Sequence, residues 1–164
     1  MHGVRILTGV KKLEKLLIIL ASISLVVIIA LFILGYRSHS GEAHGLVEGH
    51  LKQCPGTPNC VSSEFVSDAE HYIEPLVYSA DHAAQVLPRL KTIIREMGGS
   101  IQVEETDYLA ATFTSSVFRF VDDLEIRIDT GLKTIHLRSA SRVGRGDGGV
   151  NRKRVERLKS SFHF

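Results

Sequence analysis

An uncharged apolar run near the N-terminus constrains this chain more than any other feature. Residues 16–35 are 20 consecutive residues without a charge, most of them Leu, Ile or Val. A helix rises about 1.5 Å per residue, so the run would be about 30 Å long, the thickness of a bilayer's hydrocarbon core. Its serines, Ser22 and Ser24, can return their hydroxyls to the helix's own carbonyls. The sequence therefore predicts one transmembrane helix over residues 16–35.

A cleaved secretory signal peptide is the alternative interpretation of this run. The apolar part of a signal peptide is usually only about 7–15 residues long and is followed by a small-residue cleavage site. Here residues 35–38 read Gly-Tyr-Arg-Ser, and no cysteine follows closely enough to be acylated. We therefore expect a retained signal-anchor.

The basic residues that flank the run predict its orientation. Positive side chains beside a transmembrane helix tend to stay in the cytoplasm. We therefore expect residues 1–15 in the cytoplasm and a periplasmic or otherwise extracytoplasmic C-terminal domain, in a single-pass protein of the cell (inner) membrane. The basic residues are Arg5, Lys11, Lys12 and Lys15 before the run, and Arg37 and Lys52 within about 20 residues after it.

The rest of the chain is long enough for one soluble domain. Residues 36–50 are rich in Ser, Gly, His and Glu and lack hydrophobic periodicity, so we expect a juxtamembrane spacer. Residues 51–164 are too short for two domains. Residues 64–129 hold 13 acidic and 5 basic residues, whereas residues 138–164 hold 8 basic and 2 acidic ones. These segments either neutralise each other within the domain or leave a basic surface for an anionic partner.

Hydrophobic periodicity predicts an α+β domain. Residues 72–79 are expected to be extended, and Asp81 is a suitable N-cap for a helix that ends at Gly98-Gly99 and is kinked or delayed by Pro88. A final helix begins near Val150 and carries Val155, Leu158 and Phe162 on one side. The predicted order is β-α-β-β-β-β-α, an antiparallel four- to five-stranded sheet with two helices on one face. The four later strands are expected at residues 100–105, 109–115, 117–128 (bent or broken near Val121) and 134–141.

Alternation along the last two strands predicts which face of the sheet is buried. Side chains of a strand point alternately to opposite faces, so one set should form the core with the helices. The other set is charged, and we expect it on an exposed, open face. The core set is Leu124, Ile126, Ile128, Ile135, Leu137 and Ser139, and the charged set is Glu125, Arg127, His136 and Arg138.

Two longer motifs and one short block resemble a known family. Residues 54–63 read Cys-Pro-Gly-Thr-Pro-Asn-Cys-Val-Ser-Ser, and residues 138–155 form an Arg- and Gly-rich segment that leads into the last helix. The block Phe-Val-Asp-Asp at residues 120–123 lies between them. Over about residues 51–162 the chain resembles domain-of-unknown-function family 1499, found in bacteria and photosynthetic eukaryotes. The resemblance implies the domain boundary and carries no established activity, cofactor or catalytic residue.

Cys54 and Cys60 are the only cysteines, and both lie in the part expected outside the cytoplasm. Two close cysteines usually pair in an oxidising compartment, so we expect a structural disulfide. Thiol–disulfide exchange is an alternative, although oxidoreductases use a tighter Cys-x-x-Cys. A further alternative is that the two thiols are free, or that they bind a metal together with His44 and His50. The spacings do not follow the pairs typical of zinc sites, and we expect no metal and no cofactor.

The Arg- and Gly-rich segment is the preferred ligand site. Exposed amides of a glycine loop that enters a helix can bind an anion, and arginines add bidentate contacts. The commoner arrangement, which we favour over a ligand site for this segment, is that Asp147 and Asn151 cap the helix and the arginines pair with Asp122, Asp123 or Glu125. The candidate ligand-binding residues are Arg138, Arg142, Arg145, Asp147, Asn151, Arg152 and Arg154.

These features favour a binding or accessory protein over a catalyst. The expected ligand is anionic: a lipid headgroup, an envelope polymer or an acidic protein surface. The expected partners are membrane lipid through the anchor and this ligand or an envelope protein, with no nucleic acid. An envelope enzyme remains the alternative, either thiol-based or a hydrolase. For a hydrolase, Ser62 or Ser63 would need His136 as a base, and no nucleophile motif frames either serine.

Overall fold

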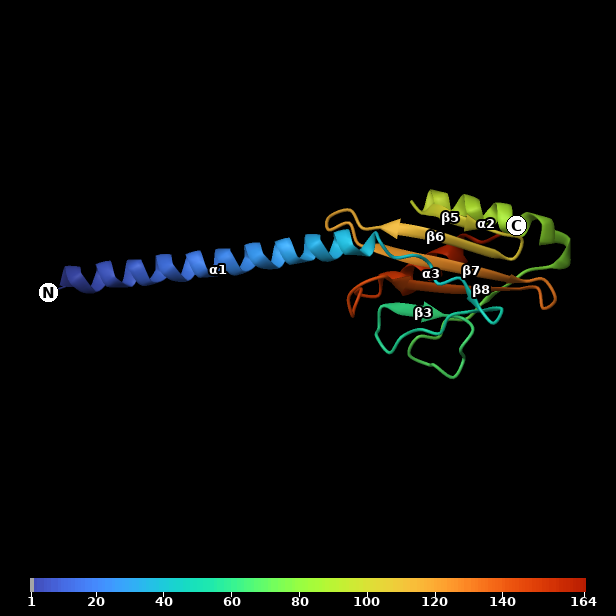
Figure 1. The fold of residues 1–164 in the computed structure, drawn as a ribbon, viewed down its shortest axis with the longest axis horizontal. Coiled ribbons are helices and arrows are strands. Elements are labelled where there is room, and N and C mark those ends of the chain that lie inside the picture. Colours follow the sequence, from blue (N-terminus) through green and yellow to red (C-terminus); the bar gives the residue numbers. More distant parts are fainter. Residues whose placement is uncertain (1) are drawn as a thin grey trace.

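A long N-terminal helix projects from one end of a mixed α/β domain in the computed structural model (Figure 1). The structure describes residues 2–164, and their side chains from residue 11 onward. Helix α1 is His2–Ser38, and Lys11–Ser38 is the one part of the described chain long and apolar enough to cross a membrane, with a mean hydropathy of 3.3 over an 18-residue stretch within it. Ser22 and Ser24 donate to Ile18 O and Leu20 O within this helix, as expected.

The domain is built on one six-stranded antiparallel sheet with a small hairpin beside it. Five strands are hydrogen-bonded in the order β3-β8-β7-β6-β5, and β4 also pairs with β8. The hairpin consists of β1 (Leu46–Val47) and β2 (His50–Leu51). The strands of the sheet are β3 (Cys60–Ser62), β4 (Leu76–Val77), β5 (Ser100–Glu104), β6 (Tyr108–Thr114), β7 (Val121–Asp129) and β8 (Thr134–Ser141).

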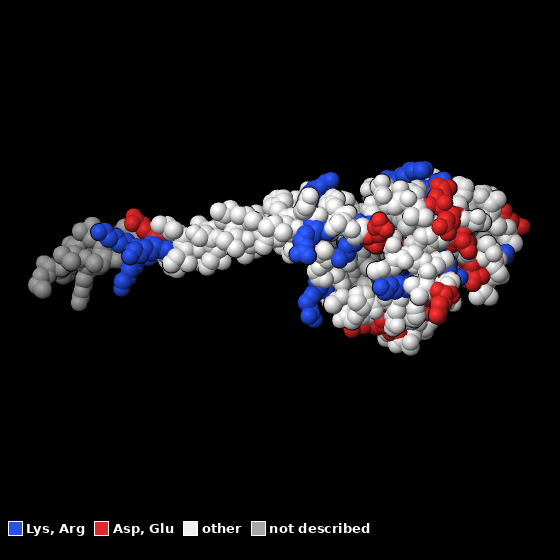
Figure 2. Space-filling model, viewed as in Figure 1, with Lys and Arg blue, Asp and Glu red and all other residues white. Residues whose placement is uncertain are grey.

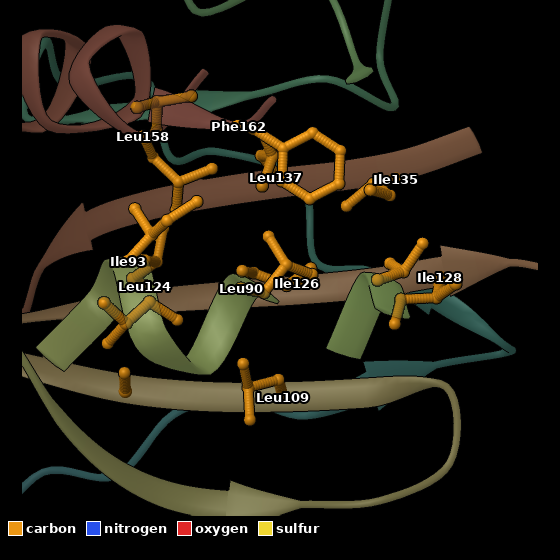
Figure 3. Close-up of a cluster of buried hydrophobic side chains, with 14 of the residues drawn as sticks. Leu90, Ile93, Leu109, Leu124, Ile126, Ile128, Ile135, Leu137, Leu158 and Phe162 are labelled. Carbon is orange, nitrogen blue, oxygen red and sulfur yellow. The ribbon is translucent and has the colours of Figure 1, made fainter. Parts of the chain in front are cut away.

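Two helices cover one face of this sheet and enclose the main core. They are α2 (Ala83–Glu96), which follows the 3-10 turn η1 (Ala80–His82), and α3 (Val150–Ser161). Figure 3 shows their apolar side chains pointing at those of β6, β7 and β8. The predicted core face of the last two strands is confirmed, and Ser139, also fully buried, donates its hydroxyl to Asn151 Oδ1. Helix α2 ends as predicted, because Gly98 takes the left-handed φ of 88° that favours glycine.

The predicted strand count and order were incomplete at the start of the domain. Strand β3 was not among the predicted strands, because three residues after a Pro- and Gly-rich segment leave no periodicity to detect. Of residues 72–79 only Leu76–Val77 forms a strand. Asp81 is not an N-cap, since it lies inside η1 and His82 occupies the cap position of α2.

The strand expected over 117–128 begins only at Val121, because residues 115–120 form a closed loop. Ser115 N donates to Phe120 O (2.8 Å) and Phe120 N to Ser115 Oγ (2.9 Å). Arg119 has a φ of 62°, which reverses the chain inside this loop. The predicted strand was therefore too long at its start, and β7 runs unbroken from Val121.

The second face of the sheet is covered, so the prediction of an open, charged face is wrong. Residues 39–54, which we call the strap, leave the end of α1 and run across β7 and β8 before entering β3 (Figure 1). Leu51 of the strap packs on Tyr108 and Ala110 of β6 and is 1% exposed. Glu125 and Arg138 beneath are 0% and 3% exposed. Hydrophobic periodicity did not predict this burial, because the strap that covers the charged face has no periodic pattern of its own.

Candidate functional site

A buried ion pair lies at the centre of the strap-covered face. Glu125 and Arg138 are directly paired positions of β7 and β8, and Arg138 Nη1 donates to Glu125 Oε2 at 2.6 Å. Tyr108 Oη (2.9 Å) and Gly45 N of the strap (3.0 Å) donate to Glu125 Oε1. Burial, followed by the Glu125 carboxylate, raises the pKa of Tyr108 well above its ordinary value. The hydroxyl therefore stays a donor, and both carboxylate oxygens of Glu125 are satisfied.

Two further ion pairs hold the strap at its ends. Near α1, Arg142 makes a bidentate pair with Asp123, with distances of 2.8 and 2.7 Å, and reaches Ser38 O at 3.3 Å. At the other end, Glu64 accepts from Arg127 Nε and from Leu51 N. These contacts are charge-assisted and largely buried, so they position the strap.

A pocket of about 520 Å³ lies between the first part of the strap and the disulfide loop. Arg138 lies in its wall, beside His44 of the strap and Lys52. The Nε of Arg138 is buried and has no hydrogen-bond partner among the residues that the structure describes. Leaving a buried charged donor unpaired costs about 1–3 kcal/mol or more, so an acceptor that reached this N–H would stabilise the protein.

The electrostatics of this pocket favour an anion. Burial, then the positive charges of Arg138 and Lys52, lowers the pKa of His44. The acidic groups in the wall are Glu42, which is exposed, and Asp123, whose two oxygens are taken by Arg142. Lys52 and Arg138, which is also paired with Glu125, are thus the lining cations that could attract a carboxylate or phosphate.

A second pocket, of about 720 Å³, lies on the other side of the strap and is less suited to an anion. It shares Gly41, Glu42 and Arg142 with the first pocket. Its wall adds Glu105 and the neutral Gln102, and its arginine is already held by Asp123.

Cys54 and Cys60 form a disulfide, with an S–S distance of 2.00 Å, and pack on Ala140 of β8. The predicted pairing is confirmed, and the alternative of free thiols is wrong. Among the side chains that the structure describes, no group of three or more His, Cys, Asp or Glu residues could hold a metal ion. The disulfide loop forms one wall of the 520 Å³ pocket, so the cysteines have a structural part in the candidate site.

His71 fastens the disulfide loop and makes its stability depend on pH. Its Nδ1 lies 2.8 Å from Asp68 Oδ1 and its Nε2 3.1 Å from Thr57 O. Burial lowers the pKa of His71, but the hydrogen bonds to Asp68 and Thr57 outweigh this effect, so the net pKa is raised.

The raised pKa of His71 predicts a larger contribution to stability at low pH. Protonated His71 stabilises the fold below the ordinary histidine pKa of about 6.5, and this stabilisation disappears as the pH rises through the higher folded-state value. In urea unfolding, His71→Gln should lose on the order of 1 kcal/mol more at about pH 5.5 than at about pH 8.5. An equal loss at both pH values would show that His71 is neutral in the folded protein.

The Arg- and Gly-rich segment mostly makes contacts within the domain. Asp147 accepts from Gly149 N (2.9 Å) and Asn151 N (2.7 Å) at the start of α3, so these helix amides are occupied. Asn151 is buried and donates to Asn59 O, Ser141 Oγ and Asp147 Oδ2. Its neighbour Arg152 donates to Tyr72 O and Glu70 O.

Of the arginines in this segment, only some lie near the pocket. Arg154 pairs with Asp122 on the helix side of the sheet, 4.6 Å above the Phe113 ring, and Arg145 is exposed. The structure brings only Arg138 and Arg142 of the predicted set to the walls of the pocket. The ion pairs of Arg142 with Asp123 and of Arg154 with Asp122 agree with the favoured interpretation, in which the arginines of this segment pair with nearby acidic residues.

Ser63 and His136 do approach each other, as the hydrolase alternative requires, but in an unsuitable setting. Ser63 Oγ lies 3.4 Å from His136 Nδ1 and accepts a hydrogen bond from Leu137 N at 2.8 Å. Ser63 is 2% exposed, and neither of the two larger pockets includes it. A substrate carbonyl has no route to this hydroxyl.

Sequence reasoning missed Lys52 as a pocket residue, considered His44 only as a possible metal ligand, and named Glu125 only as one of three possible partners of the arginines. One signal for Glu125 was present: opposite charges at paired positions of adjacent strands indicate a cross-strand ion pair. No local sequence pattern indicates that Lys52 and His44 line a pocket, because the pocket exists only once the strap is folded over the sheet.

Comparison with known proteins agrees with the fold boundaries. No curated protein matches the chain significantly. A family model described as "Protein of unknown function (DUF1499)" matches residues 50–162, which include the whole six-stranded sheet and exclude α1 and most of the strap. Since this match covers more than half of the chain, the protein belongs to this family of proteins of unknown function.

Proposed function

We propose that this protein is a membrane-anchored domain that binds an anionic group, a carboxylate or a phosphate, in the 520 Å³ pocket beside the strap. The observation that carries the proposal is the buried guanidinium of Arg138, which lines this pocket and whose Nε has no partner within the described chain. Lys52 provides a second, more flexible cation at the mouth, where it is exposed. The buried Arg138 and the flexible Lys52 together could bind an acidic group that belongs to a larger molecule.

The proposal places the domain on the extracytoplasmic side of the cell membrane. Its support is the excess of basic residues before the apolar helix, which favours a cytoplasmic N-terminus. The disulfide agrees with this placement, because such bonds persist in oxidising compartments. The ligand would then be an acidic group of the cell envelope.

Binding is favoured over catalysis by the chemistry that lines the pocket. Its sulfur atoms are held in a disulfide, and its wall contains no serine with a paired histidine. Its cations can hold an anion without a reaction.

Titration of the full chain in detergent with inorganic phosphate tests the proposal. A ligand that binds only the folded state raises the unfolding temperature as its concentration rises. We expect this shift to shrink in Lys52→Ala and with added sodium chloride, and to persist in Lys153→Ala, which removes an exposed lysine on α3, away from the pocket. The same shift in both variants, or one that does not depend on salt, would show that phosphate binds elsewhere or nonspecifically.

A further inference from the structure

The β6–β7 loop, residues 115–120, is packed against the end of α1. The Phe118 ring meets the Phe32 ring edge-on, with 5.2 Å between their centroids. The backbone also approaches closely, since a Cβ on Gly35 would lie 1.8 Å from Phe118 O. Only glycine permits this approach, so the loop is fitted to the helix.

Hydrogen bonds at the end of α1 fix this arrangement. Val121 N donates to Ser38 Oγ (3.0 Å), and His39 Nε2 lies 2.9 Å from Arg119 O. The loop is itself closed by the hydrogen bonds between Ser115 and Phe120. The helix and the loop therefore move together rather than as two parts joined by a free linker.

The position of Phe32 sets the depth of the loop. Phe32 lies three residues before Gly35, the end of the apolar run, which is about 4–5 Å along a helix. The loop beside it carries apolar side chains: Val117 is 63% exposed, and Phe118 and Phe120 are half-buried. In a bilayer that α1 spans, these side chains lie at the boundary of the hydrocarbon layer.

We propose that the β6–β7 loop is a second membrane contact, in which Val117 and Phe118 enter the bilayer beside α1 and Arg119 reaches the headgroup phosphates. This inference rests on the membrane anchor of the proposed function and does not depend on the anion pocket. Insertion of a second element fixes the orientation of the domain on the lipid surface, which a single flexible tether would leave free.

The charges around the loop agree with a lipid surface. Figure 2 shows basic side chains where α1 joins the domain, and acidic ones mainly towards the far end. Arg37 and Arg119 are both exposed at this junction, as is Tyr36 at 81%. Arginine and tyrosine are the side chains that favour the headgroup layer, and the exposed arginines complement anionic lipid.

Fluorescence of the full chain in phosphatidylcholine–phosphatidylglycerol liposomes tests the inference. A single cysteine at Val117→Cys is labelled with an environment-sensitive dye, while the native cysteines stay in their disulfide. The matched control is Leu132→Cys in the β7–β8 turn, at the other end of β7, where Leu132 is 73% exposed. We expect the dye at residue 117 to emit at shorter wavelength, to be quenched by nitroxide lipid and to be protected from iodide. The dye at residue 132 should emit at longer wavelength, be quenched by iodide and be unaffected by nitroxide lipid.

The outcomes separate this inference from the rest of the proposal. If the chain floats with the liposomes but the dye at 117 is quenched by iodide as strongly as that at 132, the loop is in water and the inference is wrong. If the chain does not float with liposomes, the anchor fails and the inference fails with it. A negative phosphate titration leaves the prediction for residue 117 unchanged, because that titration reports on the pocket alone.

Discussion

Glu125→Leu is expected to lower the free energy of unfolding by about 3–5 kcal/mol, because it leaves the buried Arg138 without its counter-ion. Tyr108 Oη and Gly45 N lose their acceptor in the same variant. The loss should appear in denaturant unfolding of the full chain in detergent. Stability equal to that of the wild type would show that Arg138 reaches solvent or another anion.

The double variant Glu125→Leu with Arg138→Met separates the charge from the packing. A buried ion pair can often be replaced by apolar side chains of similar volume at little cost, so most of the stability should return. The free energy of unfolding should still lie somewhat below that of the wild type, because the Tyr108 hydroxyl and the Gly45 amide have lost their acceptor.

This double variant also tests the pocket, because it is expected to fold while lacking the guanidinium. Its stabilisation by phosphate should be lost or strongly reduced. Retained stabilisation in a folded double variant would exclude Arg138 from the site and remove the central support for the proposed function.

Leu137→Ala is expected to cost about 2–5 kcal/mol through a cavity in the main core. Leu137 is fully buried on β8, in the cluster that α2 and α3 enclose (Figure 3). Close-packed neighbours cannot fill the space of three lost carbon atoms completely. The matched control is Leu132→Ala, which removes the same atoms from a side chain that is 73% exposed and should change stability by no more than about 0.5 kcal/mol. Equal effects at the two positions would show that the helices do not close over this face.

The helix-covered half of the fold was predictable because its signals are local. Strand β8 has the predicted bounds, and Val155 and Leu158 of α3 face the core as their spacing predicted. Side-chain alternation along β7 and β8 follows directly from strand geometry. Short strands such as β3 and β4 offer too few positions for a period, so their existence depends on β8 beside them.

The candidate site was predictable only in part, because several of its contacts join distant segments. The sequence favoured pairing of the segment's arginines with Asp122, Asp123 or Glu125 over a ligand site on the glycine loop, and Arg142 and Arg154 do pair with Asp123 and Asp122. In the structure Asp147 occupies the amides at that loop. A capping carboxylate and an anionic ligand compete for the same N–H groups, and the covalently attached carboxylate has the smaller entropic cost.

By itself, the sequence determined the apolar helix, the core face of the sheet and the closeness of the two cysteines, since each depends on residues a few positions apart. Only the tertiary structure decided that the strap crosses the charged face and turns Glu125 and Arg138 into a buried pair beside a pocket. The decisive hydrogen bond, from Gly45 N to Glu125, joins residues 80 positions apart. No periodicity reports such a contact, because the strap is ordered by the partners it meets and not by a pattern of its own.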